Sequence, residues 1–464
     1  MISYHVSGAP FTTDPLEYDA LVHHEAFGSV YASLVSLHKK GGFQPILAEK
    51  WTVSNDRKTW TFFIRPHIFF ENGDAITAKT IIDSWKRMIF LQNMRGSESQ
   101  FFKNLVGIHS FHKMSDDILG LKADGPKLTI RLSTPIERFL EIISFGNYAV
   151  VHPNDYDATS GIWKNPHKIT SSSFYKIQSW SSDSIELELK EKFLPELRHP
   201  LAFKKISLVW GETVTTDIAS GDSISNFPND YTFHGSSPSA IAFIRIYSWK
   251  DKNSPLSSLE MRKYLREKFY QSMETHGQNI TTSFFNPVMA GTDEMPREQA
   301  KAIAFESPRK INFALTLRPH NRAMFLYNNA MKETLTQNQI AGKEIKVKKP
   351  QEVYEMFDED KSPHNIDISA AFTTILIENP FDDIKFMFLS KEGLCFPDAD
   401  GRIKTELAKN TFSPQKINQL MWEQAIIWPI THFALGLWSK DFIDLSQLNL
   451  LLPPMHFAYI GAKT

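Results

Sequence analysis

Several serine and lysine pairs have the spacing that a nucleophilic enzyme would use. Ser173 and Lys176 fit the Ser-x-x-Lys pattern, in which a lysine amine activates the serine hydroxyl. The same spacing recurs at Ser36 and Lys39, Ser110 and Lys113, and Ser413 and Lys416. No Lys-Thr-Gly sequence follows any of these pairs. We therefore interpret the pattern as a coincidence and expect no catalytic serine.

Two groups of histidines have a spacing that metal binding could use. His109 and His112 would share one face of a helix, and His23 and His24 are followed by Glu25. Neither group has a further cysteine or carboxylate at a fixed spacing, so solvated or hydrogen-bonded histidines are the simpler interpretation. The sequence also lacks G-x-S-x-G, Walker, G-x-G-x-x-G and H-E-x-x-H motifs. It therefore predicts no catalytic residue, no metal site and no cofactor.

Length and composition are those of an ordinary globular protein with more than one domain. At 464 residues the chain is too long for one core and predicts two or three domains. Charged residues make up 22% of the chain and the net charge is −1, which gives no electrostatic case for nucleic acid or an anionic membrane. No run of about 18 apolar residues predicts a transmembrane helix. The single cysteine, Cys395, excludes an internal disulfide framework.

The stretch from Pro45 to Phe90 has the clearest local structure. Trp60, Phe62 and Ile64 alternate with polar or exposed positions, which predicts a strand with one buried face. Asn55-Asp56 and Asn72-Gly73 predict turns on either side of it. Thr77 is placed to cap a helix whose apolar residues fall on one face, namely Ile81, Ile82, Trp85, Met88 and Ile89.

The residue choices in this stretch resemble a known family. The order is a Leu-Ala-Glu-x-Trp strand, a turn, a Trp-Thr-Phe strand, an Asn-Gly turn and a Thr-Ala helix start. It resembles the bacterial extracellular solute-binding proteins of family 5, which capture oligopeptides or dipeptides for ATP-driven importers. The matching residues are Leu47, Ala48, Glu49, Trp51, Trp60, Thr61, Phe62, Arg65, Gly73, Thr77, Ala78, Ser84, Trp85 and Arg87.

Other segments extend the resemblance along the chain. Thr13-Asp14-Pro15 resembles the Leu-Asp-Pro turn near the start of mature family members. Tyr175, Lys176 and Trp180 match a later landmark, where Ser171 and Ser173 stand at the two glycine positions of the family's Gly-x-Gly-Pro turn. A turn with positive φ would be strained without those glycines, so we expect a loop of different shape.

The resemblance implies an α/β fold of the two-lobed periplasmic-binding-protein type (type II, cluster C-like), with an extra subdomain and a hinged interlobe cleft. We expect residues 1–32, 165–235 and 430–464 to form the first lobe, 33–164 the subdomain and 236–429 the second lobe. Apolar spacing further predicts a helix from Glu17 to Leu37 and a strand from Lys127 to Leu132. A strand, a helix and a strand between Ile311 and Lys348 predict a βαβ unit.

The resemblance also implies the function. The chain would be the substrate-binding component of an ABC importer, a monomer that delivers a small polar or peptide-like solute to permease subunits in the membrane, with no nucleic-acid partner. The first alternative is a cytoplasmic ligand sensor with the same fold, although no helix-turn-helix or basic patch supports it. The second alternative, an enzyme, lacks a coherent catalytic set.

The N-terminus bears on the compartment. A secretory signal has a basic region followed by an apolar region, and Met1 to Val6 has neither. The chain begins where processed family members begin, at a strand before the Asp-Pro turn. We therefore expect a periplasmic or extracytoplasmic protein whose signal or lipobox is removed.

Positions in the family give the candidate ligand-binding residues, which are Ser33, Phe174, Phe243, Thr373 and Glu378. Peptide-binding members resemble one another in an Ala-Asp-Tyr-x-x-Pro segment, whose Asp pairs with the α-ammonium group of the peptide. Aligned on Pro380, this chain has Leu376 at the Asp position. Glu378, two residues away, would substitute for the Asp if the register slips, and Asp382 or Asp383, beyond the proline, are equal alternatives. A buried ammonium group without a counter-charge is costly. We therefore predict that the protein does not anchor a free peptide N-terminus in the usual way.

Overall fold

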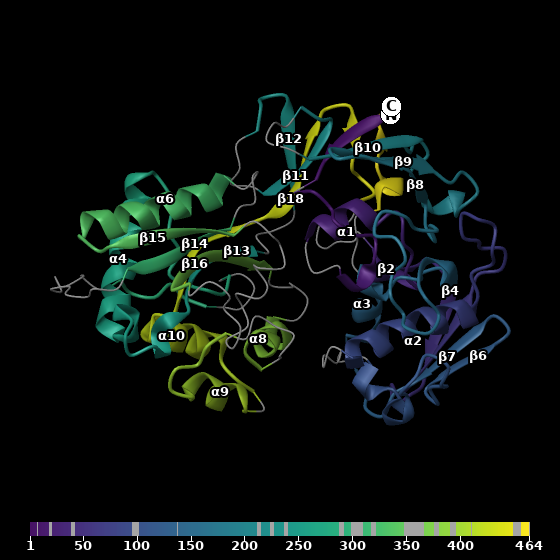
Figure 1. Ribbon diagram of the computed structural model, residues 1–464, viewed down its shortest axis with the longest axis horizontal. Coiled ribbons are helices and arrows are strands. Elements are labelled where there is room, and N and C mark those ends of the chain that lie inside the picture. The colour runs from purple at the N-terminus through teal and green to yellow at the C-terminus, as the bar shows by residue number, and fades with distance from the viewer. Residues whose placement is uncertain are drawn as a thin grey trace. The chain divides into compact units, whose positions relative to one another are not determined.

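The computed structural model of the protein divides into two compact units (Figure 1). Unit 1 comprises Met1–Ser220, Phe227–His234 and Leu437–Thr464, and unit 2 comprises Gly221–Asn226 and Gly235–Gly436. The structure describes residues 1–6, 8–17, 21–38, 42–94, 102–136, 138–210, 215–222, 227–235, 240–286, 292–297, 310–316, 322–347, 366–374, 380–389, 396–409, 411–448 and 456–463. The expected subdomain over 33–164 and the expected lobe boundaries stay predictions.

A seven-stranded sheet forms the centre of unit 1, with the strand order β12-β18-β11-β1-β10-β9-β8. The strands are β1 (Ile2–His5), β8 (Tyr175–Trp180), β9 (Ser184–Leu189), β10 (Lys205–Val209), β11 (Ile218–Asp222), β12 (Tyr231–Gly235) and β18 (Leu435–Lys440). The N-terminal strand β1 lies between β10 and β11 and runs parallel to both. The sheet therefore joins segments from the start, middle and end of the chain.

A second, antiparallel sheet in unit 1 contains the stretch in which the sequence was clearest. Its order is β4 (Ala48–Val53), β5 (Thr59–Ile64), β7 (Lys127–Arg131) and β6 (Leu121–Asp124). Trp60, Phe62 and Ile64 are buried, as their alternation predicted. Helix α2 (Ala78–Met94) packs against β6 and β7, and the Thr77 hydroxyl accepts a hydrogen bond from the Thr80 amide at 3.2 Å. The predicted strand, its turn and the capped helix are all confirmed.

The helix expected from Glu17 to Leu37 is wrong beyond residue 27. Helix α1 covers only Leu21–Phe27, and β2 (Val35–Leu37) pairs with β3 (Phe43–Pro45). The residues between them are buried, but in an irregular segment. Ala32 N–H donates to the Ser172 hydroxyl at 3.1 Å and Ala32 C=O accepts from Val150 N–H at 2.9 Å. These tertiary hydrogen bonds replace the helical ones, and helical spacing of apolar residues does not reveal them.

Unit 2 is built on a five-stranded mixed sheet, with the order β15-β14-β16-β13-β17. The strands are β13 (Ala240–Ile246), β14 (Ile311–Thr316), β15 (Gly342–Val347), β16 (Ile368–Thr374) and β17 (Ile427–Phe433). β13 is buried at every residue and pairs antiparallel with β16 and β17. β14 runs parallel to β15 and α6 (Arg322–Gln337) connects them, which confirms the predicted βαβ unit.

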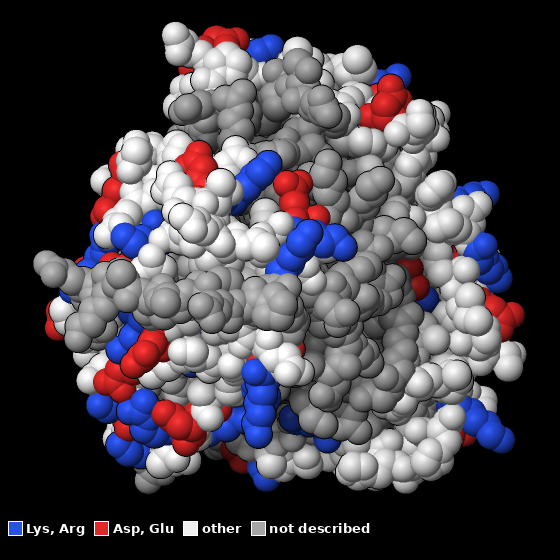
Figure 2. Space-filling view, turned by 60° about the vertical axis from the view of Figure 1, so that its left-hand side comes forward, with Lys and Arg blue, Asp and Glu red and all other residues white. Residues whose placement is uncertain are grey.

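The remaining elements lie outside these sheets. They are α3 (Phe139–Ser144), α4 (Leu259–Thr275), α8 (Pro380–Leu389), α9 (Arg402–Leu407), α10 (Pro414–Gln424) and the short pair β19 (Ile443–Asp444) and β20 (Gly461–Ala462). Short 3₁₀ segments include Pro153–Asp155 and Phe457–Tyr459. Among the described residues, none of the helices combines the length and the apolar character that crossing a bilayer requires. On the face shown in Figure 2, basic and acidic side chains are interspersed.

Candidate functional site

The candidate ligand-binding residues are distributed over both units. Ser33 and Phe174 belong to unit 1, and Phe243 and Thr373 belong to unit 2. Glu378, like Leu376, lies outside the described residues. The role of these residues toward a ligand stays a prediction.

Ser33 is buried between two elements of unit 1. Its hydroxyl donates to the Phe145 carbonyl, just after α3, at 3.4 Å. Its own carbonyl accepts from Leu47 N–H, just before β4, at 3.3 Å. Ser33 is 7% exposed, so the second sheet and α3 hold this residue in one position.

Three fully buried serines form the loop that precedes β8. The Ser172 hydroxyl donates to the Val150 carbonyl at 2.7 Å and accepts from Ala32 N–H at 3.1 Å. The Ser171 hydroxyl donates to the Val30 carbonyl at 2.9 Å. None of the residues 171–174 has a positive φ. Side-chain hydrogen bonds therefore shape this loop without the φ > 0 turn that glycines permit, as the loss of the glycines predicted.

Phe174 ends this loop inside an aromatic cluster. Its ring centroid lies 5.1 Å from that of Phe193, 6.0 Å from that of His456 and 5.9 Å from that of Tyr459, all edge to face. The side chain is fully buried. In this structure Phe174 thus packs in the core of unit 1, whatever it contacts when a ligand is present.

His456 and Tyr459 are residues of this cluster that sequence reasoning missed. His456 precedes the 3₁₀ segment Phe457–Tyr459 near the C-terminus and Tyr459 ends it, and the Tyr459 hydroxyl accepts from the Gln44 amide at 2.7 Å. Burial lowers the pKa of His456 to about 4, which keeps its imidazole neutral at pH 7. Among the described residues, the buried His456 Nδ1 and Ser173 Oγ have no hydrogen-bond partner. No local pattern brings these segments together, because the contacts are long-range.

Lys190 fixes the other side of the serine loop. Its amine donates to the carbonyls of Ser171 at 3.1 Å and Phe69 at 3.3 Å, and it lies 4.8 Å from the Phe193 ring centroid. Burial lowers the pKa of Lys190 to about 8, an effect that the charge of Glu71 opposes. A lysine therefore binds the turn before α2 to the loop before β8.

In unit 2, Phe243 lies in β13, between β16 and β17. Its ring centroid is 5.5 Å from that of Phe284 and 5.4 Å from that of Phe396, and the side chain is fully buried. Thr373, on β16, is half-buried and stands opposite Ile241 in the strand register. Phe243 therefore has the surroundings of a core residue here, whereas Thr373 retains access to solvent.

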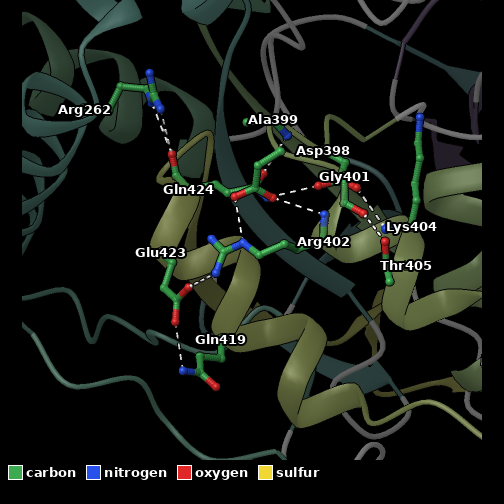
Figure 3. Close-up of polar contacts among 11 residues, drawn as sticks. Arg262, Asp398, Ala399, Gly401, Arg402, Lys404, Thr405, Gln419, Glu423 and Gln424 are labelled. Carbon is green, nitrogen blue, oxygen red and sulfur yellow. Dashed lines mark hydrogen bonds and ion pairs between the residues drawn. The ribbon is translucent and has the colours of Figure 1, made fainter.

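A polar network holds the chain next to Phe396 (Figure 3). The Gln424 amide nitrogen, at the end of α10, donates to Asp398 and Asp400, each at 3.0 Å, and its oxygen accepts from Ala399 N–H at 3.0 Å. Arg262 of α4 donates to the Gln424 carbonyl at 3.2 Å and 3.1 Å. Gln424 therefore joins α4, α10 and the turn before α9, and fixes the position of the segment that carries Phe396.

These surroundings supply hydrogen-bonding groups and aromatic faces. Within the part of the chain that the structure describes, no three His, Cys, Asp or Glu side chains are grouped so that they could hold a metal ion. Ser173 and Lys176 do not act as a pair, because the Lys176 amine contacts Glu188 at 2.9 Å.

Comparisons with known proteins agree with the resemblance drawn from the motifs. Residues 42–216 match the family described as bacterial extracellular solute-binding proteins, family 5. The dipeptide-binding protein DppE of Bacillus subtilis is 29% identical over 175 residues, which are 36% of this chain and 32% of that protein. The periplasmic murein peptide-binding protein MppA of Escherichia coli is 26% identical over 181 residues, 38% of this chain and 33% of that protein. The nickel-binding periplasmic protein of the same organism is 27% identical over 157 residues, 33% of this chain and 30% of that protein.

Solved structures match over almost the full length. The structure of Escherichia coli MppA has a TM-score of 0.74 at 15% identity and covers 99% of this chain and 98% of its own. A dipeptide-binding protein from Pseudoalteromonas, in complex with Met-Leu, has a TM-score of 0.74 at 13% identity and covers 100% of both chains. These matches confirm the predicted two-lobed α/β fold of type II.

The two kinds of comparison differ in extent. The sequence alignments span about a third of the length of the relatives, whereas the structural matches span nearly all of both chains. The family consists of extracellular or periplasmic solute-binding proteins rather than enzymes. The sequence of residues 42–216 and the fold of the whole chain thus confirm the resemblance to the bacterial extracellular solute-binding proteins of family 5.

Proposed function

We propose that the chain is the substrate-binding component of an ABC importer, which captures a small polar or peptide-like solute and delivers it to the permease. The observation that carries this proposal is the match of residues 42–216 to the solute-binding family, within a fold that matches peptide-binding proteins throughout. The relatives reported above are all binding proteins, which does not favour the cytoplasmic sensor.

The remaining parts of the proposal concern compartment and partners. The protein acts outside the cytoplasm, as a monomer, and returns its solute chemically unchanged. It has no nucleic-acid partner, which the near-neutral charge and the interspersed charges in Figure 2 support. The permease of the importer is its macromolecular partner.

The solute is of a kind that does not need a carboxylate at position 376. The names of the relatives include dipeptide-binding, murein peptide-binding and nickel-binding proteins, so related sequences serve different solutes. Leu376 cannot pair with an ammonium group, although Glu378 is close in sequence. The proposal is a solute other than a free linear peptide, or a peptide held by other groups.

Isothermal titration calorimetry with mixed di- to pentapeptides and their N-acetylated forms tests this proposal. We expect similar affinities for a peptide and its acetylated form, or no binding of either, together with binding of another polar solute. Glu378→Gln removes the charge of this side chain and keeps its size. It therefore shows whether the Glu378 carboxylate supplies the charge that Leu376 cannot. Tight binding of free peptides that acetylation abolishes and Glu378→Gln leaves unchanged would contradict the proposed solute class while supporting solute binding itself.

Substitutions test the proposed walls of the site. Thr373→Ala and Ser33→Ala remove one hydroxyl each and are expected to weaken solute binding while the fold persists. Phe174→Ala and Phe243→Ala open cavities in the cores, and such changes cost about 3–5 kcal/mol of stability. Phe174→Leu and Phe243→Leu are therefore the better variants, with affinity measured after circular dichroism confirms the fold. Unchanged affinity in all four variants would remove these residues from the site.

A further inference from the structure

The Asn72-Gly73 pair lies at the tip of an exposed turn in unit 1, between β5 and α2. Phe69 and Ala75 form an isolated antiparallel bridge at its base, and Phe70 N–H donates to the Asp74 carbonyl at 2.9 Å. Gly73 has a φ of +92°, which an L side chain rarely adopts. Asn72 and Gly73 are both exposed to solvent.

An exposed Asn-Gly pair has a chemistry of its own. The glycine nitrogen loses its proton and attacks Cγ of the asparagine, the new N–C bond closes a succinimide ring, and the Cγ–Nδ2 bond breaks to release ammonia. Water then opens the ring at either carbonyl, which gives aspartate or isoaspartate, so one water is consumed for each ammonia released. Asparagine is thermolabile in this sense. The reaction requires a free glycine nitrogen and an asparagine side chain that can rotate toward it.

In this structure both groups are held. Gly73 N–H donates to the Phe70 carbonyl at 3.1 Å, so the attacking nitrogen is engaged. Asn72 Oδ1 accepts from Asp74 N–H at 3.0 Å, and Asn72 Nδ2 donates to Asp74 Oδ2 at 2.8 Å. The asparagine amide is therefore bound at both ends to Asp74, and its Nδ2 also lies 3.2 Å from His152 Nε2, so its rotation requires that these contacts break.

His152 extends this contact into the body of unit 1. It is 4% exposed, and its Nδ1 accepts from Asn154 N–H at 3.0 Å. This role leaves the imidazole proton on Nε2, which lies 2.8 Å from Asp74 Oδ2 and donates to it. The Phe70 ring packs edge to face on the imidazole at 4.7 Å. The carboxylate that holds Asn72 is thus itself held by a buried histidine.

We propose that Asn72-Gly73 is a deamidation site that the fold masks, and that Asp74 and His152 maintain the mask. Conversion of Asn72 to aspartate or isoaspartate removes the Nδ2 donor and places a second carboxylate beside Asp74. Like charges this close repel, so the product turn loses the side-chain hydrogen bond that joins position 72 to Asp74.

The test compares deamidation rates at pH 8 and 37 °C by mass spectrometry of the peptide that contains Asn72, with enzymatic detection of isoaspartate. A synthetic peptide of residues 68–78 gives the unmasked rate. Because several hydrogen bonds must open first, we expect the folded protein to react roughly tenfold or more slowly than this peptide. Asp74→Ala and His152→Phe, which keeps the ring that faces Phe70, are expected to approach the rate of the peptide.

Asp83→Ala is the matched control, because it removes an exposed carboxylate that pairs with Lys79 on α2 and does not touch the turn. It is expected to react as slowly as the unaltered protein. Circular dichroism at 37 °C identifies any variant that unfolds. Because Asp74 is exposed and His152 is buried, Asp74→Ala is expected to disturb the fold less than His152→Phe. An unaltered protein that reacts as fast as the peptide, or a folded Asp74→Ala that reacts as slowly as the unaltered protein, would overturn the proposal.

Discussion

At the scale of single residues, unit 1 buries several polar side chains. The free-energy cost of burying each one depends on whether it has hydrogen-bond partners. Ser172 and Ser173 are neighbours and both fully buried, but of the two only the Ser172 hydroxyl has partners among the described residues, at Val150 and Ala32. A buried backbone group that loses its partner costs about 1–3 kcal/mol. The two serines therefore form a natural pair for comparison.

We predict that Ser172→Ala lowers the free energy of unfolding by about 2 kcal/mol or more, because it leaves Ala32 N–H and Val150 C=O without this hydroxyl. Ser173→Ala removes a hydroxyl without a partner among the described residues, and it is expected to be neutral or stabilising. Urea-induced unfolding of both variants measures the difference. An equal decrease in the free energy of unfolding in both variants would show that the hydrogen bonds of the Ser172 hydroxyl do not stabilise the fold.

A second prediction concerns pH and His456. Burial lowers its pKa to about 4. Between pH 6.5 and 4, His456 is therefore protonated in the unfolded chain and neutral in the folded protein. The neutral His456 makes its full contribution to the free energy of unfolding above pH 6.5. This contribution falls by about 1.4 kcal/mol per pH unit as the pH decreases toward 4.

His456→Phe fits the aromatic cluster around Phe174 and removes the titrating group. The slope of unfolding free energy against pH between 6.5 and 4 should become shallower by about 1.4 kcal/mol per unit. His23, whose pKa burial and the charge of His24 lower to about 4, leaves a residual slope. His109→Gln, at an exposed histidine, serves as the control and should keep the full slope. An unchanged slope in His456→Phe would contradict the assignment.

At the scale of elements, two motifs that are distant in sequence meet in one buried ion pair. Arg87 of α2 donates to Asp14 through Nη1 at 2.9 Å and Nη2 at 2.6 Å, and both side chains are buried. Arg87 also donates to the Gly161 carbonyl at 2.8 Å. The Asp-Pro turn and the α2 motif, which the sequence presented as separate landmarks, thus belong to one structural contact.

Asp14→Ala leaves the buried guanidinium group without a carboxylate, which is expected to cost about 3–5 kcal/mol. Adding Arg87→Met removes the unpaired charge, so the double variant should lose less than the sum of the two single variants. The exposed pair of Lys79 and Asp83 provides the comparison, and Lys79→Ala should change stability by less than about 1 kcal/mol. A double variant that loses as much free energy of unfolding as the Asp14 and Arg87 single variants together would contradict this account.

The elements also show what the sequence could predict. Alternation at Trp60, Phe62 and Ile64 and the cap at Thr77 predicted β5 and the start of α2, because these signals depend on neighbours in the chain. The segment after Phe27 has apolar residues at helical spacing, yet its backbone bonds to Ser172 and Val150. His456 packs in the aromatic cluster at Phe174, and no local sequence pattern predicts this contact. The missing information was long-range pairing, which the period of one segment does not contain.

At the scale of the whole molecule, the chain builds most of unit 1, forms the main part of unit 2 from Gly235–Gly436, and returns to unit 1 for its last residues. The returning segment supplies β18 to the seven-stranded sheet and His456 to the aromatic cluster. Unit 1 is therefore complete only when the C-terminal segment is in place. The proposed capture of a solute rests on the match of residues 42–216 to the solute-binding family, and the solved structures support the fold.

The most direct test of that claim is a retention experiment with the full chain. The purified protein is mixed with peptides and other small polar solutes, separated from unbound solute by gel filtration, and denatured, and the released molecules are weighed by mass spectrometry. We predict that one class of solute is retained and is recovered with the mass it had when added. Retention of no solute from any class, or release of a product whose mass differs from that of the added solute, would contradict the account.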